Sequence, residues 1–422
     1  GYNKLVVSQL DYSDPLTENS KIEAGARISI RNFKNETNNY FLKDTDFVFF
    51  PNVSSKYRFT DNIYAAYGTY SNKINKLMYQ AGLRLESSDY TGTLIDRNES
   101  FHIQYPLSLF PSAYLTYKLP KNQDLQLNYS RKINRPNFFQ LMPFADFTDP
   151  QNISIGNAAL KPEFTNALDF DYQKLTEKGF SFLATLYYKY TGHIITRYQY
   201  KGISANGIDS AVYNTFQNAN YSQSYGLELT AKTPIAKWWE IITNVNFYNA
   251  SINGGNIASN LTTERLSAYG KMNWNFYLPK NISVQLTGDY QNKTVLPVGG
   301  SSAGNTQGGG QGRGMGGGGF GGMRDQQVSS SQGYINPNYG VDIALKWDFI
   351  KNVASLSLSV SDVFKTKKYS SFSETPYFTQ DYTRKRDQQI IRINLNFRFG
   401  KMDTSLFKRK NNRVESEGIQ GM

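Results

Sequence analysis

Long stretches of strict two-residue alternation constrain this chain more than any other feature of its sequence. In residues 391–399 every odd position is apolar and every even position is polar or charged. Residues 282–287, 355–361 and 125–130 alternate in the same way. A period of two is that of a β-strand, because successive side chains point to opposite faces. No comparable stretch shows the 3.6-residue period of a helix, so the sequence predicts an all-β fold with very little helix.

The alternation predicts fifteen strands, many of them longer than the five or six residues that are usual in soluble proteins. They are long enough to cross a bilayer at a tilt, which takes about 9–11 residues. The predicted strands are 1–12, 20–33, 57–71, 76–91, 102–119, 124–135, 162–175, 180–199, 212–233, 238–251, 262–278, 281–296, 334–349, 353–365 and 386–399.

Connections of two lengths alternate along the chain. The short ones hold turn residues, such as Asp14-Pro15 and Glu177-Lys178-Gly179. The long ones include 34–56, 136–161, 297–333 and 366–385, with further ones at 92–101, 200–211 and 252–261. Short periplasmic turns and long extracellular loops are the pattern of an outer-membrane barrel. The sequence therefore predicts an antiparallel up-and-down transmembrane β-barrel over residues 1–399, followed by a polar periplasmic tail over 400–422.

The composition fits a barrel with a wet lumen. Only 39% of the residues are hydrophobic, yet 15% are aromatic. Alternation divides them between a lipid-facing and a polar face, and pairs such as Trp238 and Trp239 fit an interfacial aromatic girdle. The chain has no cysteine and only two histidines, His102 and His193, neither within a motif. We therefore expect no metal site, no cofactor and no catalytic residues.

The direction of the strands gives another expectation. If the last strand runs toward the periplasm, counting back makes strand 1–12 run downward as well. A closed bacterial barrel normally has an even number of strands, and its first strand rises from the periplasm. Fifteen strands that begin with a descending one predict that further strands precede residue 1, so that the chain is the C-terminal portion of a larger barrel.

A run of motifs between residues 128 and 163 carries a family resemblance. Asn-Tyr-Ser-Arg-Lys-Ile-Asn-Arg-Pro (128–136) is followed by Gln-Leu-Met-Pro-Phe (140–144), Asp-Pro (149–150) and Gly-Asn-Ala-Ala-Leu-Lys-Pro-Glu (156–163). It resembles the barrel of TonB-dependent receptors, in particular the outer membrane protein beta-barrel family common in Bacteroidetes, and departs from its pattern at Lys132, Met142 and Ala158. The motif residues are Arg131, Arg135, Pro136, Pro143, Phe144, Asp149, Pro150, Gly156, Asn157, Leu160, Pro162 and Glu163.

The resemblance implies bacterial outer-membrane receptors for solute uptake, with 22-stranded barrels whose extracellular loops capture the ligand. It also implies a plug and a short box that contacts the TonB energiser. Neither is found in this sequence, so contact with the TonB system would run through an upstream plug. Outer-membrane lipid and lipopolysaccharide are the expected surroundings. The alternatives are a non-transporting barrel subunit or scaffold of a larger outer-membrane complex, and a soluble secreted β-protein.

The motif loop can also be interpreted from its residues. Arg135-Pro136 predicts a strand end, because proline cannot donate to the ladder. Gly156-Asn157 predicts a turn with positive φ. The apolar residues favour a loop that packs over the barrel mouth, with direct contact to a ligand or partner as the second interpretation. The candidates for that contact are Phe138, Phe139 and Phe147 in this loop, and Arg313, Phe320 and Arg324 in loop 297–333.

Residues 299–322 hold 14 of the 34 glycines. This is the composition of a flexible tether rather than of a phosphate-binding loop, since no Gly-Lys-Ser/Thr follows. We expect a disordered extracellular loop, or alternatively a mobile lid or partner-capturing arm. The net charge of +12 is spread over strands and loops with no nucleic-acid motif. We therefore expect no nucleic-acid partner.

Overall fold

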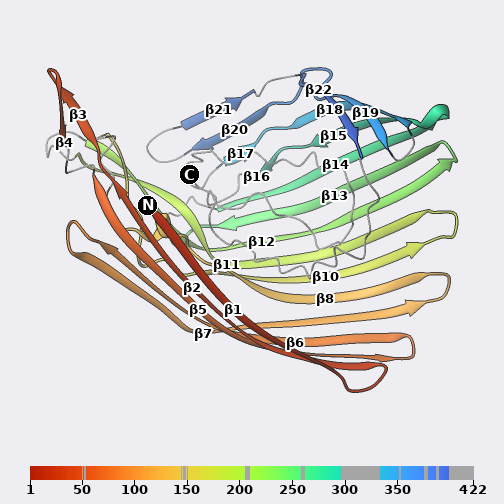
Figure 1. Cartoon of the computed structure of the whole chain (residues 1–422), viewed down its shortest axis with the longest axis horizontal. Coiled ribbons are helices and arrows are strands. Elements are labelled where there is room, and N and C mark those ends of the chain that lie inside the picture. The colour runs from red at the N-terminus through yellow and green to blue at the C-terminus, as the bar shows by residue number, and fades with distance from the viewer. Residues whose placement is uncertain are drawn as a thin grey trace.

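Fifteen antiparallel strands form one curved wall, in which each strand lies beside its neighbours in the chain (Figure 1). The computed structural model describes residues 1–49, 51, 54–143, 145, 149, 151–204, 210–257, 262–295, 333–350, 353–374, 379–385 and 389–398. The wall strands are β1 (Tyr2–Pro15), β2 (Ser20–Thr37), β5 (Ser55–Ile74), β6 (Leu77–Leu94), β7 (Glu99–Leu119), β8 (Gln123–Asn134), β10 (Glu163–Leu175), β11 (Ser181–Ile203), β12 (Ser210–Ala236), β13 (Trp239–Asn253), β14 (Thr262–Leu278), β15 (Ile282–Gln291), β18 (Asn338–Ile350), β19 (Ala354–Val360) and β22 (Ile391–Phe397).

The predicted strands and short turns are confirmed. Turn residues adopt the left-handed conformation where the chain reverses: Asn75 has φ 52°, Asn122 has φ 52° and Gly179 has φ 83°. Asparagine and glycine tolerate this conformation best, so the turn chemistry matches the sequence. In the described part of the chain, helix is limited to α1 (Phe138–Leu141), the 3₁₀ turn η2 (Pro279–Asn281) and a 3₁₀ residue at Pro51. None of the described helices is long and apolar enough to cross a membrane.

Several predicted boundaries are wrong near the long connections. The predicted loop 92–101 is only a turn at 95–98, because β6 and β7 continue their pairing to Leu94 and Glu99. The predicted strand 281–296 leaves the wall after Gln291, and 353–365 leaves it after Val360. Asp362 has φ 50°, which ends the extended backbone there.

Short strands that do not belong to the wall lie in the predicted long loops and at the ends of the predicted strands 281–296 and 334–349. β3 (Tyr40–Lys43) and β4 (Asp46–Phe49) form a hairpin. β9 (Asn152–Ser154) pairs in parallel with β12. A separate four-stranded sheet, here called the small sheet, has the order β16 (Thr294–Val295), β17 (Gly333–Ile335), β20 (Tyr369–Glu374) and β21 (Thr379–Arg384).

The two faces of the wall differ in chemistry, as the alternation predicts. One face exposes large apolar side chains, among them Leu168, Leu186, Phe247, Leu345 and Leu395. The opposite face carries hydrogen-bonded polar side chains. Loops pack against this polar face, since Tyr248 of β13 shares a hydrogen bond with Thr294 of the small sheet (2.9 Å). We call the polar face inner and the apolar face outer, as exposure to lipid requires.

The described wall has two unpaired edges. β1 pairs only with β2, and β22 pairs only with β19. The first and last described strands therefore do not close the sheet into a barrel. An open edge leaves a row of backbone N–H and C=O groups without partners, which hydrocarbon cannot satisfy.

A charge introduced on the outer face tests the assignment of the two faces. Leu168→Arg would place a guanidinium in lipid and destabilise the wall by about 2–4 kcal/mol if the site lies near the bilayer midplane. The matched control is Ala167→Arg, because Ala167 is the preceding residue and points to the inner face. Urea titration in lipid vesicles, with folding followed by gel mobility without boiling, measures the difference. Equal stability of the two variants would refute the assignment.

Candidate functional site

The described residues of the connection 135–162 fold back onto the inner face at the long-loop end of the wall, and we call this connection the mouth loop. β8 ends at Asn134, and α1 follows after Asn137. The Asn137 side chain accepts a hydrogen bond from the backbone N–H of Gln140 (3.0 Å), and the Gln140 side chain accepts one from the N–H of Asn137 (2.8 Å). This reciprocal capping box fixes the single turn of helix, which is too short to be stable on its own.

The turn of helix anchors an aromatic cluster. Phe138 stacks on Tyr57 with ring centroids 4.6 Å apart and contacts Phe59 at 5.0 Å. Leu141 is completely buried in the same cluster, and Leu160 from the end of the loop is 2% exposed. Phe139, by contrast, is 53% exposed. The structure thus buries one of the two neighbouring phenylalanines in packing and leaves the other accessible.

The returning half of the mouth loop is held by backbone contacts. The N–H of Gly156 donates to the carbonyl of Met142 (2.8 Å), and the N–H of Asn157 donates to that of Gln140 (2.7 Å). The Asn157 side chain donates to the carbonyl of Phe216 on β12 (2.9 Å). β9 pairs with the part of β12 just beyond, which ties the loop to a strand some 60 residues later in sequence.

The prediction that Gly156 supplies a positive φ is wrong. Among the described glycines only Gly179 has a positive φ. At Gly156 a Cβ would lie 2.4 Å from the Met142 carbonyl oxygen and 2.7 Å from that of Phe139. Glycine is needed there because two backbone segments approach closely, not because of the turn.

Charged members of the motif bind the loop to its neighbours. Arg135 forms an ion pair with Glu86 of β6 and donates to the Ser88 hydroxyl (3.2 Å). Glu163, at the start of β10, accepts hydrogen bonds from the Asn134 side chain (2.7 Å) and from the N–H of Ile195 (2.6 Å). Arg135 lies at the start of the mouth loop and Glu163 follows its end. Their contacts therefore fix where the loop leaves the wall and where it rejoins it.

The remaining predicted residues are placed as follows. The Arg131 guanidinium lies 4.7 Å from the ring centroid of Phe164. Pro136 and Pro162 are buried, and Pro143 is half-buried. The Asp149 side chain accepts from the N–H of Gln151 (3.0 Å), as in a local turn. Phe144, Phe147, Pro150, Arg313, Phe320 and Arg324, together with most of loop 297–333 and the tail 400–422, lie outside the described residues.

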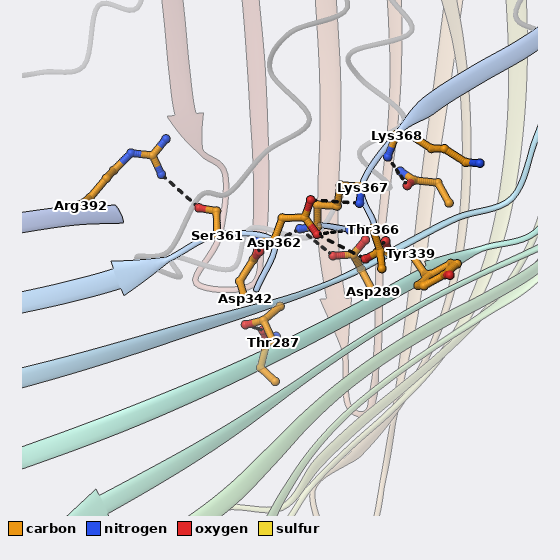
Figure 2. Close-up of polar contacts among 12 residues, drawn as sticks. Thr287, Asp289, Tyr339, Asp342, Ser361, Asp362, Thr366, Lys367, Lys368 and Arg392 are labelled. Carbon is orange, nitrogen blue, oxygen red and sulfur yellow. Dashed lines mark hydrogen bonds and ion pairs between the residues drawn. The ribbon is translucent and has the colours of Figure 1, made fainter. Parts of the chain in front are cut away.

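A second polar cluster, which the sequence did not predict, joins the small sheet to the wall (Figure 2). Lys367 lies in the segment that leads from β19 into β20. Its ammonium forms ion pairs with Asp289 of β15 (3.1 Å) and with Asp342 of β18 (3.0 Å). Asp362 accepts hydrogen bonds from the N–H groups of Thr366 (2.8 Å) and Lys367 (3.1 Å). We call this cluster the Lys367 latch.

The electrostatics of the latch favour a charged lysine. Burial alone would lower the pKa of Lys367, but hydrogen bonds to Asp342 and Asp289 and their charges outweigh it. The pKa is therefore raised above its usual 10.5. No sequence signal identified this residue, because its partners are 25 and 78 positions away and lie on strands that alternation alone describes.

The described residues contain no group of three or more His, Cys, Asp or Glu that could hold a metal ion. His102 instead pairs with Asp89 (3.3 Å) and contacts the Thr91 hydroxyl (3.1 Å). The arrangement at the long-loop end is thus one of packing and ion pairing around an inner face. Chemically it can present polar and aromatic side chains to a bound solute.

A sequence model of the "Outer membrane protein beta-barrel family" matches residues 1–305 and 318–398 of this chain. Together these segments cover nearly all of the described wall and both loop clusters. A search of curated proteins found no match.

Solved structures share the fold at low sequence identity. One is a copper transporter, OprC, with a TM-score of 0.62 and 14% identity, covering 94% of this chain and 56% of that one. The ferric yersiniabactin uptake receptor FyuA from Yersinia pestis has a TM-score of 0.60 and 13% identity, covering 94% of this chain and 54% of that one. The ferric citrate transporter FecA has a TM-score of 0.61 and 14% identity, covering 94% of this chain and 55% of that one. The chain therefore spans about half the length of these structures.

The close backbone approach at Gly156 generates a testable expectation. Gly156→Ala would force the mouth loop away from α1, at a cost of about 1–3 kcal/mol. Hydrogen exchange of peptides covering residues 137–157 would therefore accelerate, whereas the wall strands would keep their protection. Gly270→Ala is the control, since a Cβ there meets no atom within 4 Å. Unchanged exchange in the first variant would contradict the packing described.

The Lys367 latch gives a second expectation. Lys367→Met would raise hydrogen exchange in residues 361–374 by about threefold to tenfold, because a charged hydrogen-bonded pair is lost. Lys368→Met is the matched control, since the Lys368 side chain is exposed. The raised pKa means that the latch is complete below pH of about 10.5 and weakens as pH rises through the folded pKa. Equal exchange in both variants across neutral pH would show that the latch does not hold this segment.

Proposed function

Because the chain belongs to the outer membrane protein beta-barrel family, we propose that it is the wall and extracellular-loop portion of a TonB-dependent receptor for solute uptake. The observation that carries this proposal is that long loops fold inward onto the polar inner face. Phe138 brings the mouth loop onto the inner side of β5, and Lys367 brings the small sheet onto β15 and β18. Such loops line a mouth through which a solute approaches, rather than extending away from it.

The inner face suits a passage for a polar solute. Its side chains are hydrogen-bonded amides, hydroxyls and carboxylates, for example Asn128 to Asp171 (2.8 Å) and Thr185 to the same Asp171 (2.5 Å). Water can enter such a lumen, whereas the outer face excludes it. OprC, FyuA and FecA, which share this fold, are described as transporters or uptake receptors for copper, ferric yersiniabactin and ferric citrate. Their functions support uptake as the role of this fold without naming the solute here.

Closure of the barrel is part of the proposal. The unpaired edges of β1 and β22 need partner strands in a membrane, because lipid offers no hydrogen bonds. The similar structures are longer than this chain, which covers only 54–56% of each. We propose that further strands pair with the two edges and close the barrel. The resemblance implies 22 strands for the complete barrel. A plug would then gate the lumen and contact the TonB system.

One observation favours the alternative of a subunit in a larger outer-membrane complex. The β3–β4 hairpin exposes an apolar face at its tip, with Phe47 77% and Leu42 62% exposed. Tyr40 and Phe49 lie on the same face, opposite each other across the hairpin. Exposed apolar patches of this kind mark surfaces that bind other proteins.

A gene deletion separates the two functions. The deletion strain is compared with a strain lacking the TonB energiser in media where copper, ferric citrate or another single chelated iron source limits growth. Uptake by the receptor predicts that the deletion reproduces at least one growth defect of the energiser mutant, with complementation by the intact gene. The scaffold would be favoured if the deletion strain shared no growth defect with the energiser mutant in any of these media. Stable partners should then also co-purify with the protein from detergent-solubilised membranes.

A further inference from the structure

Two basic side chains share one aromatic ring where the small sheet meets the wall. The Lys293 ammonium lies 3.7 Å from the ring centroid of Tyr334, and the Arg265 guanidinium lies 5.3 Å from the same centroid. Arg265 is on β14, Lys293 follows β15, and Tyr334 is the central residue of β17. The Tyr334 ring in turn stacks on Phe372 of β20 (5.2 Å). Four segments of the chain, namely β14, the link after β15, β17 and β20, therefore position this cluster.

Neither cation has a carboxylate partner among the described residues. Glu264 precedes Arg265 and therefore lies on the opposite face, where it accepts a hydrogen bond from Asn249 (2.6 Å). Asp381 is paired in register with Phe372, yet it forms no ion pair with either cation. The Arg265 Nε is buried without a hydrogen-bond partner. The positive charge of this cluster is not balanced by neighbouring side chains.

Two other basic side chains at the long-loop end differ from Arg265 and Lys293, because both have carboxylate partners. Arg135 meets Glu86, and Lys367 meets both Asp289 and Asp342. Taking a charge out of water without a partner is costly, and two like charges beside one ring raise that cost. The contact with a ring face offsets only part of this cost. An uncompensated cationic pair that is nonetheless held in place is what a binding site for an anion requires.

The groups around the cluster match an oxyanion. A guanidinium presents parallel N–H donors to two oxygens, and an ammonium adds a point charge with three donors. The Tyr334 hydroxyl makes no hydrogen bond within the described structure, so it is a further donor. Arg265 and Lys293 can only donate hydrogen bonds, as is expected for a site that receives negatively charged oxygens.

We propose that Arg265, Lys293 and Tyr334 form a binding site for an oxyanionic group, either a phosphate or a carboxylate, at the joint between wall and small sheet. Because Arg265 belongs to the wall and Tyr334 to the small sheet, an anion bound there bridges the two. Occupancy would then stabilise the position of the small sheet. That such a ligand is a transported solute rests on the proposed function, whereas binding itself does not.

Calorimetric titration of the detergent-purified protein tests the site. The probes are inorganic phosphate and succinate, which carry the two oxyanion types and are measured separately in 50 mM chloride. At least one is expected to bind with a dissociation constant of about 1 mM or tighter. Arg265→Gln and Lys293→Gln should each weaken that binding by about tenfold, because each removes a charged hydrogen-bond donor. No binding of either probe, or unaltered binding in both variants, would overturn the proposal.

A matched variant guards against a general loss of charge. Lys189→Gln removes another inner-face lysine that lies over a ring, Tyr187 at 5.1 Å, and it should bind the probe as the unmodified protein does. An equal loss in this control would show that overall charge, not the site, drives binding. Gel mobility without boiling shows that each variant is folded. If a probe binds but the deletion strain shows no uptake defect, the anion site is supported and the proposed transport function is refuted.

Discussion

Every backbone group of the wall depends on a neighbouring strand for its hydrogen bond, because the hydrocarbon of a bilayer offers none. This requirement explains why the wall consists of long antiparallel strands joined in sequence order, with irregular backbone confined to their ends. It also fixes the side chains. Once the ladder is formed, alternate residues face lipid and lumen, and a shift of one residue would exchange the two faces. The polar inner face and the apolar outer face therefore follow from one constraint.

The same constraint places functional variety at the long-loop end. A wall strand cannot bend away from its neighbours without losing backbone hydrogen bonds. New contacts are therefore made where the strands extend beyond the membrane. The mouth loop and the small sheet make such contacts in two different ways. The first uses apolar packing around Phe138 and a close approach at Gly156, whereas the second uses the ion pairs of Lys367. Both press loop structure onto the inner face, which narrows the mouth and lines it with side chains from distant parts of the chain.

How far the sequence predicts this structure depends on the range of the interactions involved. Alternation and turn residues are local, so the fifteen wall strands and turns such as that at Gly179 could be predicted. The change of sheet between Gln291 and Thr294 could not, because the polar run at 291–294 does not reveal which strand the next residues pair with. Gly156 was recognised as special for the wrong reason, since the backbone that approaches it belongs to α1 and to Met142, the residue that follows α1. Lys367 and the pair Arg265 and Lys293 depend on contacts between different strands, which a single sequence does not display.

The short strand β9 has a consequence for the order of assembly. β13 pairs with β12 only as far as Tyr221, so the upper part of β12 would keep a free edge on that side. β9 covers residues 212–214 of this edge, in parallel orientation. Yet β9 precedes β12 in the chain, and β10 and β11 lie between them. The rim can therefore be sealed only after those strands have joined the wall, so a nascent protein carries an exposed rim edge until late in its folding, when the mouth loop settles onto it.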